Sequence, residues 1–326
     1  MTERCSICGN AAGNRVHVAR EMMFGLRDQF RYLQCNECGC LQLLDAVDAL
    51  SRYYPSDYYS LRPPAGGGLR ARLKAKWLRH GLGERNPAGA LASLVLGESQ
   101  LVDWVRRTGI GLHDRILDVG SGAGHLLWDF RSAGFADLTG IDPYIAEETH
   151  RGGLRVLKTS LEELEGRWDL VMLHHSFEHL REPLQVLRRI RNLLSPSGRV
   201  LIRTPVADSW AWRTYGIDWV QLDPPRHLFV HTRASLDLLA GAAGLSIYDL
   251  VHDSTIMQFW GSEQYRRDIP YYDPRSYKVD PRRSIFSRRS VAAFKAAARR
   301  LNARGEGDQI CLYLRLADEL PEVPQP

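Results

Sequence analysis

The sequence predicts an α/β fold with a doubly wound, largely parallel sheet, preceded by a small cysteine-rich segment. Three observations support this prediction. From residue 99 onward, short β-rich runs alternate with helix-length segments; a glycine-rich turn follows the first of these runs; and two C-x-x-C pairs lie within the first forty residues. Regular alternation of strands and helices is typical of a parallel sheet covered by helices on both faces.

Composition sets limits on the class of protein. The chain has 326 residues, of which 44% are hydrophobic and 25% charged, so it can bury a large core. It contains no apolar run of the ~18 residues that a membrane span needs, and its first residues do not resemble a secretory leader. We therefore expect a cytoplasmic protein. A formal charge of +5 is compatible with anionic partners but small for a nucleic-acid binder.

The cysteine pairs predict a structural metal site. Each pair is followed by glycine, and the ligands expected for zinc are Cys5, Cys8, Cys35 and Cys38. Four thiolates hold Zn²⁺ tetrahedrally, whereas redox chemistry usually needs one C-x-x-C at the start of a helix. Zinc binding supplies about 10 kcal/mol or more to a segment too small to fold alone. Cys40 could substitute as a ligand, and Cys311 is expected to be a buried hydrophobic residue.

Pro and Gly in "LRPPAGGG" mark a boundary after a Tyr-rich stretch. Beyond it, Leu69, Leu73 and Trp77 repeat at helical spacing among Arg and Lys, which predicts a basic amphipathic helix. Such a helix either covers the neighbouring domain or meets an anionic surface. The predicted organisation is a zinc knuckle and Tyr-rich cap at 1–60, a linker and basic helix at 61–98, and an α/β domain at 99–326 with insertions at 206–230 and 254–305.

The α/β pattern begins with a helix that Ser99 can cap and Gly109 can end. Another helix starts at Pro183, with leucine and isoleucine at helical spacing. Predicted strands cover 115–120, 137–143, 154–158, 168–175 and 198–205.

The turn "LDVGSGAGHLL" joins the first strand to a helix, with glycine at 120, 122 and 124. Glycine lets a ligand approach the backbone, and the free amides at a helix start offer hydrogen-bond donors. A dinucleotide site would need glycine where His125 stands, so phosphate binding is disfavoured. Asp142 ends the second strand, where a carboxylate can accept hydrogen bonds from both hydroxyls of a ribose.

These segments, with "WDLVMLHHSFEHL" and "LRRIRNLLSPSGRVLIRTP", resemble class I methyltransferases that use S-adenosylmethionine. The resemblance covers about 115–317 and implies a Rossmann-like, seven-stranded sheet whose last strand, "QICLYLRLA", is antiparallel. By position, it implies that the cofactor is held by Asp118, Gly120, Ser121, Gly122, Gly124, His125, Asp142, Pro143, Ser160, Leu161 and His174.

Methyl transfer requires aligned reactants and, for a hydroxyl acceptor, a base. "HHSFEH" after the fourth strand supplies His175, Glu178 and His179 as candidate catalytic residues. H-x-x-E-H is also the order of an inverted zinc-protease motif, but that motif needs one long helix, and here Pro183 starts another helix soon afterwards. The alternative for His179 is a structural bond to the neighbouring backbone.

A second histidine stands in "DPPRHLFVHT". Sugar-modifying and cell-envelope methyltransferases carry a similar Pro-x-His-Leu segment beside the acceptor, which makes His227 the expected general base, with Glu178 or His179 orienting it. The alternative is a histidine that only fixes the loop, the role expected of His231. The candidate substrate contacts are Tyr58, Tyr59, Trp219 and Arg226. The alternative for Trp219, with Trp210 and Trp212, is the small core of a lid.

The resemblance is strongest to methyltransferases of deoxysugar and surface-polysaccharide pathways, in which a zinc segment precedes a Tyr-rich stretch. This chain lacks the sizeable third domain of the C-methylating members, which favours a hydroxyl acceptor on a nucleotide-linked or lipid-linked glycan precursor. The basic stretch 277–304 could meet a pyrophosphate or a membrane face, or could be an ordinary solvated helix. The rival hypotheses are a zinc-knuckle ribosomal RNA methyltransferase and a non-catalytic protein with a relic fold.

Overall fold

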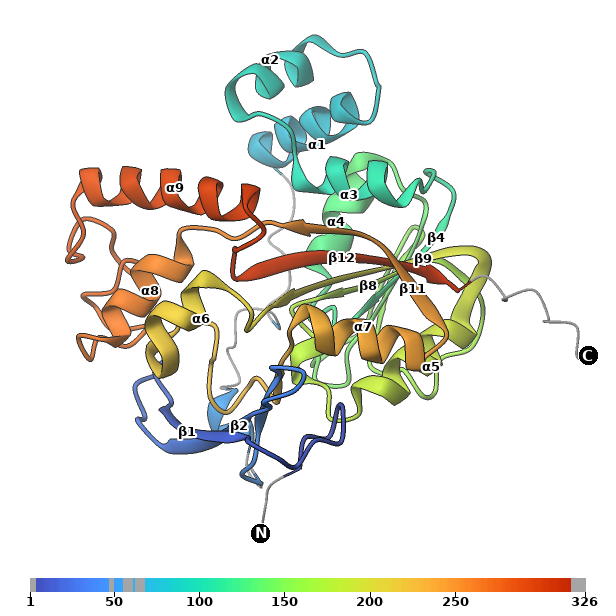
Figure 1. Cartoon of the computed structure of the whole chain (residues 1–326). Helices are drawn as coiled ribbons and strands as arrows, with labels where there is room; N and C mark the ends of the chain where they lie inside the picture. The colour runs from blue at the N-terminus through green and yellow to red at the C-terminus, as the bar shows by residue number, and fades with distance from the viewer. Residues whose placement is uncertain (1–3, 47–49, 55–60, 62–67, 318–326) are drawn as a thin grey trace, which may run out of the picture.

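The computed structural model describes residues 4–46, 50–54, 61 and 68–317. The chain folds around a large mixed sheet with helices on both faces (Figure 1). Its eight strands have the order β11-β12-β9-β8-β4-β5-β7-β6. In chain order these are β4 (Arg115–Val119), β5 (Asp137–Ile141), β6 (Thr149–Arg151), β7 (Leu154–Leu157), β8 (Trp168–His174), β9 (Leu194–Pro205), β11 (Leu245–His252) and β12 (Gln309–Leu316).

The strand directions confirm the predicted sheet. Strands β7, β5, β4, β8 and β9 are parallel neighbours, and the last strand, β12, lies antiparallel between β9 and β11. The seven expected strands are all present. The eighth strand, β6, has three residues and pairs antiparallel with β7 at the edge.

Helices cover the two faces because the central strands are apolar on both sides. Along β8, Val171 and Leu173 pack into one core and Leu170 and Met172 into the other. The first core is covered by α5 (Pro183–Leu193) and α7 (Arg233–Ala242), and the second by α3 (Gln100–Thr108) and α4 (His125–Ala133).

Local signals mark the ends of these helices, although Ser99 stands at the N-cap of α3 without a side-chain capping hydrogen bond. Gly109 ends α3 in the left-handed conformation, and Pro183 is the first residue of α5. Thr232 caps α7 in a reciprocal capping box with Ser235. The long β9 begins at the residue directly after α5. Just beyond its other end, Val206 forms a β-bridge with His231 in the loop that precedes α7.

A second sheet joins the N-terminal segment to a distant loop. It contains β1 (Arg15–Arg20), β2 (Gln29–Gln34), β3 (Leu41–Leu43) and, paired antiparallel with β3, β10 (Phe229–Val230). Its apolar face shares a core with the 206–230 insertion, in which Tyr32 and Leu41 meet Trp212 and Trp219. The N-terminal segment and this insertion are thus built as one unit.

The remaining elements lie in the insertions and short turns. The helices are α6 (Trp210–Tyr215), α8 (Met257–Tyr265) and α9 (Arg288–Ala303), and the 3-10 turns are η1 (Leu50–Tyr53), η3 (Phe177–His179) and η4 (Gly216–Asp218). None of the helices in the described part of the chain combines the length and apolar character needed to cross a bilayer.

The predicted basic helix is α1 (Leu69–Gly81), but it is only half of a hairpin. A second helix, α2 (Pro87–Leu96), packs against it, and the pair projects from the body of the molecule (Figure 1). Leu78 is the buried residue of α1. Leu69 and Leu73, expected to cover a neighbouring domain, are instead exposed, because α1 contacts the body mainly through α4.

Candidate active site

The glycine turn joins β4 to α4 in a conformation that only glycine adopts easily. Gly120 and Gly124 have φ of 74° and 79°. A Cβ on Gly120 would lie 2.6 Å from Cβ of Ser176, and one on Gly124 would lie 2.6 Å from Cγ2 of Val156. The backbone therefore packs directly against the residue that follows β8 by two positions and against β7, and a side chain at either glycine would clash. Ser121 and Gly122 complete the turn, and His125 is the first residue of α4.

Asp142 ties this turn to the end of β5. Its Oδ2 accepts a hydrogen bond from the Gly122 amide at 3.0 Å, and its Oδ1 accepts one from the Tyr144 amide at 2.8 Å. Each carboxylate oxygen keeps a second lone pair. The acid expected to bind a ribose is therefore held beside the glycine turn, and the exposed Pro143 follows it.

Asp118 lies beneath the same turn and is 3% exposed. Burial and the negative charge of Asp142 raise the pKa of Asp118 to about 8. Two carboxyl groups thus face one small region, and one of them holds its proton near neutral pH. A cationic ligand in this region would favour the ionised form of Asp118.

The other expected cofactor residues are spread along the strand ends. Ser160 and the buried Leu161 follow β7. His174 ends β8 and lies on Trp104 of α3, with ring centroids 4.5 Å apart. Its position at the strand end agrees with the expectation, but its contact is with the helix that covers the sheet.

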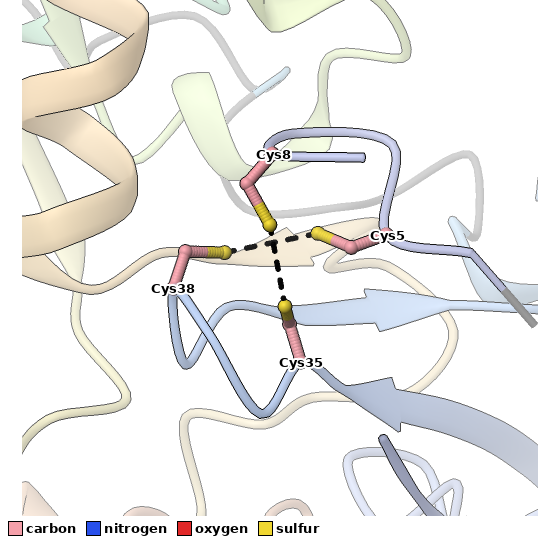
Figure 2. Close-up of side chains that lie close together, drawn as sticks. All are labelled: Cys5, Cys8, Cys35 and Cys38. Atoms are coloured by element: carbon pink, nitrogen blue, oxygen red, sulfur yellow. Dashed lines mark hydrogen bonds between the residues drawn. The ribbon is translucent and has the colours of Figure 1, made fainter. Parts of the chain in front are cut away.

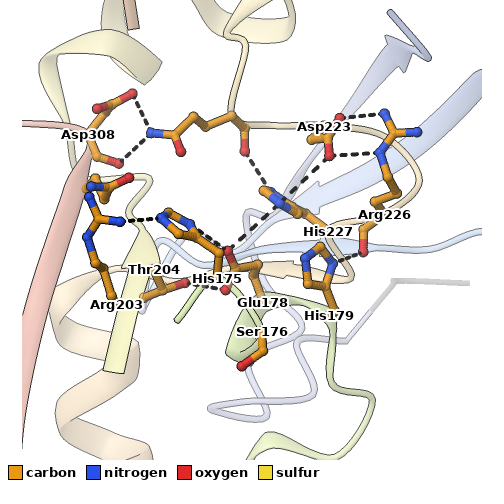
Figure 3. A network of polar contacts seen from close by, with 12 residues as sticks. His175, Ser176, Glu178, His179, Arg203, Thr204, Asp223, Arg226, His227 and Asp308 are labelled. Atoms are coloured by element: carbon orange, nitrogen blue, oxygen red, sulfur yellow. Dashed lines mark hydrogen bonds and ion pairs between the residues drawn. The ribbon is translucent and has the colours of Figure 1, made fainter. Parts of the chain in front are cut away.

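The motif after β8 forms a buried acid–imidazole cluster (Figure 3). Glu178 is fully buried, and its Oε2 accepts a hydrogen bond from Thr204 Oγ1 at 3.1 Å. His175 Nδ1 lies 3.4 Å from Glu178 Oε1, and Arg203 donates to His175 Nε2 at 3.0 Å. Burial alone would raise the pKa of Glu178, but the neighbouring His175 and the imidazoles of His179 and His227 hold it at about 2. Glu178 is therefore a carboxylate.

His227 faces this carboxylate from the loop before β10. Its Nδ1 donates to the Gln221 carbonyl at 2.8 Å, which leaves a lone pair on Nε2. Nε2 is 3.9 Å from both Glu178 Oε1 and Asp223 Oδ2. Burial and the neighbouring His179 lower the pKa of His227 to about 4, so its imidazole is neutral at pH 7. The arrangement presents an unprotonated nitrogen between two carboxylates.

His179 completes the cluster. Its Nδ1 donates to the Arg226 carbonyl at 2.7 Å, and its ring lies 4.9 Å from that of His227. The structural bond considered for His179 is thus present, and Nε2 remains for other partners. Ligand atoms of Glu178, His179 and His227 lie within 4.8 Å of one another, so the cluster can take up a proton and has the donor set for a divalent cation.

Backbone strain marks the same place. His175 and Asp223 have φ of 52° and 44°, values that residues other than glycine seldom adopt. Both side chains face the cluster (Figure 3). Strained backbone is concentrated at functional sites, where surrounding contacts hold it.

Two expected substrate contacts have other roles. Arg226 is 1% exposed, with ion pairs to Glu21 Oε1 at 3.1 Å and Asp223, and it binds the Tyr53 carbonyl. Trp219 is equally buried, and its Nε1 donates to Asp308 at 3.0 Å. Arg226 therefore fastens the histidine loop to the N-terminal segment, and Trp219 fills the core of the insertion. These two predictions of substrate contact are corrected.

In the Tyr-rich stretch, the residue that contacts the histidine cluster is Tyr54, which the sequence analysis did not single out. Tyr58 and Tyr59 lie outside the described residues. Tyr54 is described, and its hydroxyl is 3.3 Å from His179 Nδ1. Burial raises the pKa of Tyr54, so it is a neutral phenol. The repeated tyrosines were a signal for this region but did not indicate which of them reaches the histidines.

The four predicted zinc ligands converge (Figure 2). Sγ of Cys5 is 3.7 Å from that of Cys38, and Sγ of Cys8 is 3.4 Å from that of Cys35. Thiolates 2.3 Å from a tetrahedral metal lie about 3.8 Å apart, so the donor set and its spacing fit zinc. All six cysteines are free of disulfides. Cys40 stands apart, with its Sγ 3.8 Å from His231 Nδ1, and Cys311 is buried as expected.

The cysteine cluster is physically joined to the histidine loop. Thr232 donates a hydrogen bond to the Cys38 carbonyl, and Tyr32 donates to the His227 carbonyl at 2.8 Å. Leu43 donates to the Leu228 carbonyl where β3 meets β10. The position of His227 therefore depends on the N-terminal sheet.

Known proteins with which the chain shares sequence similarity include methyltransferases. A sequence model of the family described as "Methyltransferase domain" matches residues 79–250. The ubiquinone biosynthesis O-methyltransferase of Aeromonas salmonicida is 30% identical over 169 residues, covering 46% of this chain and 70% of that protein. The tRNA U34 carboxymethyltransferase of Alcanivorax borkumensis is 33% identical over 106 residues, covering 29% of this chain and 33% of its own length. An S-adenosylmethionine dependent methyltransferase structure from Mesorhizobium loti has a TM-score of 0.43 and 14% identity, over 67% of this chain and 98% of that one.

Proposed function

The chain belongs to the methyltransferase-domain family, and from this premise we propose that it methylates a sugar hydroxyl of a nucleotide-linked or lipid-linked glycan precursor. The family and the sheet order make it an S-adenosylmethionine-dependent methyltransferase. The observation that carries the acceptor proposal is the pairing of a ligand turn with a buried, unprotonated His227 Nε2 beside Glu178.

S-adenosylmethionine, when bound, supplies an electrophilic methyl group on a positively charged sulfur. The glycine turn offers it backbone amides and close approach, and Asp142 has lone pairs for its ribose. We assign its binding to the turn and strand-end residues Asp118, Gly120, Ser121, Gly122, Gly124, His125, Asp142, Pro143, Ser160, Leu161 and His174.

His227 is proposed to accept the proton of the acceptor hydroxyl as the new oxygen–carbon bond forms and the carbon–sulfur bond breaks. Its Nδ1–H is held by the Gln221 carbonyl, so Nε2 is the accepting atom. Glu178 and Asp223 stabilise the imidazolium that results, since both carboxylates lie 3.9 Å from Nε2. His179, His175 and Tyr54 orient this group and the acceptor.

The four cysteines are proposed to hold a structural zinc ion that positions the N-terminal sheet. Unpaired thiols fit the reducing cytoplasm, where we place the reaction. A hydroxyl acceptor is supported by the base geometry and by the relative named as an O-methyltransferase. A sugar is supported by the resemblance of "YYPSDYYS" and "PPRHL" to deoxysugar and polysaccharide methyltransferases.

The acceptor can be identified directly. The protein is incubated with labelled S-adenosylmethionine and an extract of sugar nucleotides and glycolipids, and the labelled product is identified by mass spectrometry. A methyl ether on a sugar is expected. Label in RNA would favour the tRNA-methylating relatives instead, and no heat of S-adenosylmethionine binding by calorimetry would indicate a relic fold.

Cofactor affinity is expected to rise with pH through about 8 because of Asp118. The protonated acid must lose its proton to face a sulfonium, so binding below this pH releases a proton. Each unit by which binding lowers the pKa of Asp118 corresponds to about a tenfold gain in affinity. Calorimetry from about pH 6 to about pH 9 measures this dependence.

Asp118→Asn should remove the pH dependence. S-adenosylhomocysteine, whose sulfur is neutral, provides the matched ligand control and should show a weaker dependence. Equal dependence for the two ligands would show that Asp118 does not sense the sulfonium.

A further inference from the structure

The α1–α2 hairpin reverses the usual arrangement of a surface helix. In α2, Gly89 faces α1, where a Cβ would lie 2.4 Å from the Lys76 carbonyl oxygen. The large apolar side chains point to solvent: Leu91, Leu94, Val95 and Leu96 are 65%, 84%, 76% and 64% exposed. Amphipathic helices of globular proteins normally bury such residues. Their exposure on one short helix indicates an interaction surface.

Hydrogen bonds between α1 and α2 nevertheless hold the hairpin together. Trp77 Nε1 donates to the Gly97 carbonyl at 3.0 Å. Asn86 caps α2 by accepting from the Gly89 amide, and it donates to the Lys76 carbonyl. The Trp77–Gly97 bond places the end of α2 one turn from the exposed Leu73 of α1. The exposed Leu73 of α1 therefore lies near the C-terminal end of α2.

The same hairpin carries a concentrated positive charge. Residues 69–96 contain six Arg or Lys against the single acid Glu84, a net charge of +5 that equals the formal charge of the whole chain. Lys74 pairs with Asp129. Among the hairpin's other cations, the described part of the chain offers no ion pair to Arg70, Arg72, Lys76, Arg79 and Arg85, and Arg79 donates to the Ser132 carbonyl.

We propose that the α1–α2 hairpin docks on the headgroup region of an anionic phospholipid bilayer. Exposed leucine and valine side chains beside a basic helix match an interface with an apolar interior and anionic headgroups. α2 has ten residues and is about 15 Å long, so it lies in the interface and does not cross the bilayer.

The charge also argues against a second copy as the occupant. Two hairpins face to face would bring +5 against +5 with no acid except Glu84 to offset it. The hairpin projects from the body of the molecule beside α3 and α4 (Figure 1). Docking there would hold the whole molecule at the membrane surface, a property that goes beyond the methyl-transfer reaction.

Vesicle flotation of the full-length protein tests this proposal. The protein is expected to float with vesicles of phosphatidylcholine plus phosphatidylglycerol, and to remain below with phosphatidylcholine alone or at high salt. Leu94→Glu combined with Val95→Glu should lower the vesicle partition coefficient by about a hundredfold, from about tenfold per buried aliphatic side chain. Arg70→Glu with Arg72→Glu should abolish the preference for anionic vesicles.

Two matched controls locate the surface. Leu238→Glu changes a half-exposed leucine on α7, and Arg299→Glu with Arg300→Glu reverses exposed charges on α9. Both should float like the wild type and, like the hairpin variants, keep the wild-type melting temperature. The proposal would be overturned if the wild type did not float, or if the α9 variant lost flotation. It would also be overturned if the wild type were a dimer that bound no vesicles and that the Leu94/Val95 variant converted to a monomer. Because flotation needs neither cofactor nor acceptor, its outcome is independent of the proposed reaction.

Discussion

Replacing Cys35 with serine is expected to release zinc and to unfold the N-terminal sheet, with a loss of about 10 kcal/mol of folding free energy for that segment. Cys35 is one of four thiolates that converge on a single point, and the segment around it has few apolar residues of its own. Because β3 pairs with β10, methyl transfer should be lost with the sheet. The glycine turn is far along the chain in the α/β domain, so cofactor binding should survive.

Three measurements check this expectation: zinc content by mass spectrometry, thermal unfolding, and calorimetry with S-adenosylmethionine. Cys40→Ser is the matched control, because Cys40 is equally buried but its sulfur lies beside His231 outside the cluster. It should retain zinc. The structural zinc site would be contradicted if purified wild-type protein lacked stoichiometric zinc, or if the two variants had the same melting temperature.

His227→Ala is expected to lower kcat by about 10²- to 10⁴-fold while leaving the affinity for S-adenosylmethionine unchanged. His227 Nε2 is the only imidazole nitrogen in the described cluster that lies 3.9 Å from two carboxylates. Removing it deletes the proton acceptor but no contact to the glycine turn. Added imidazole should restore part of the rate, a response that a purely structural residue would not give.

His231→Gln is the matched control for His227. His231 is fully buried four residues further on, with a pKa also lowered to about 4 by burial, but it bonds Ser235 and Cys40. This variant should lose stability and keep its turnover. Near-normal kcat in His227→Ala would exclude the base role. Loss of wild-type activity in EDTA with recovery in a divalent cation would assign the cluster to metal binding instead.

Local sequence signals were sufficient for the α/β domain. The glycine turn, the helix end at Gly109 and the strand at 168–174 each depend on neighbours within a few residues, and each was found as expected. The same holds for the cysteine pairs, whose spacing reflects the geometry of one tetrahedral ion. His175, Glu178 and His179 lie together because they follow the carboxyl end of β8, whereas His227 reaches them from a loop that the N-terminal sheet holds.

What the sequence did not indicate depends on contacts between distant segments. β10 has two residues, too few for any periodic signal, and its partner β3 lies almost two hundred residues away. Arg226 and Trp219 looked like binding residues because their types are common in sites, but their burial follows from the packing of the N-terminal sheet on the insertion. α2 was missed because its outward face is apolar and its inward face small, the reverse of the pattern that marks a surface helix.

The pairing of β3 with β10 has a consequence for how the chain is made. During synthesis the cysteine segment leaves the ribosome first, yet the edge of its sheet stays open until residues 229–230 have been translated. The nascent segment can acquire its metal early but can complete its hydrogen bonding only after most of the α/β domain has been translated. Exchange of this segment between related proteins must therefore carry the matching loop with it, or the chimera would contain the His227 loop without its backbone partner.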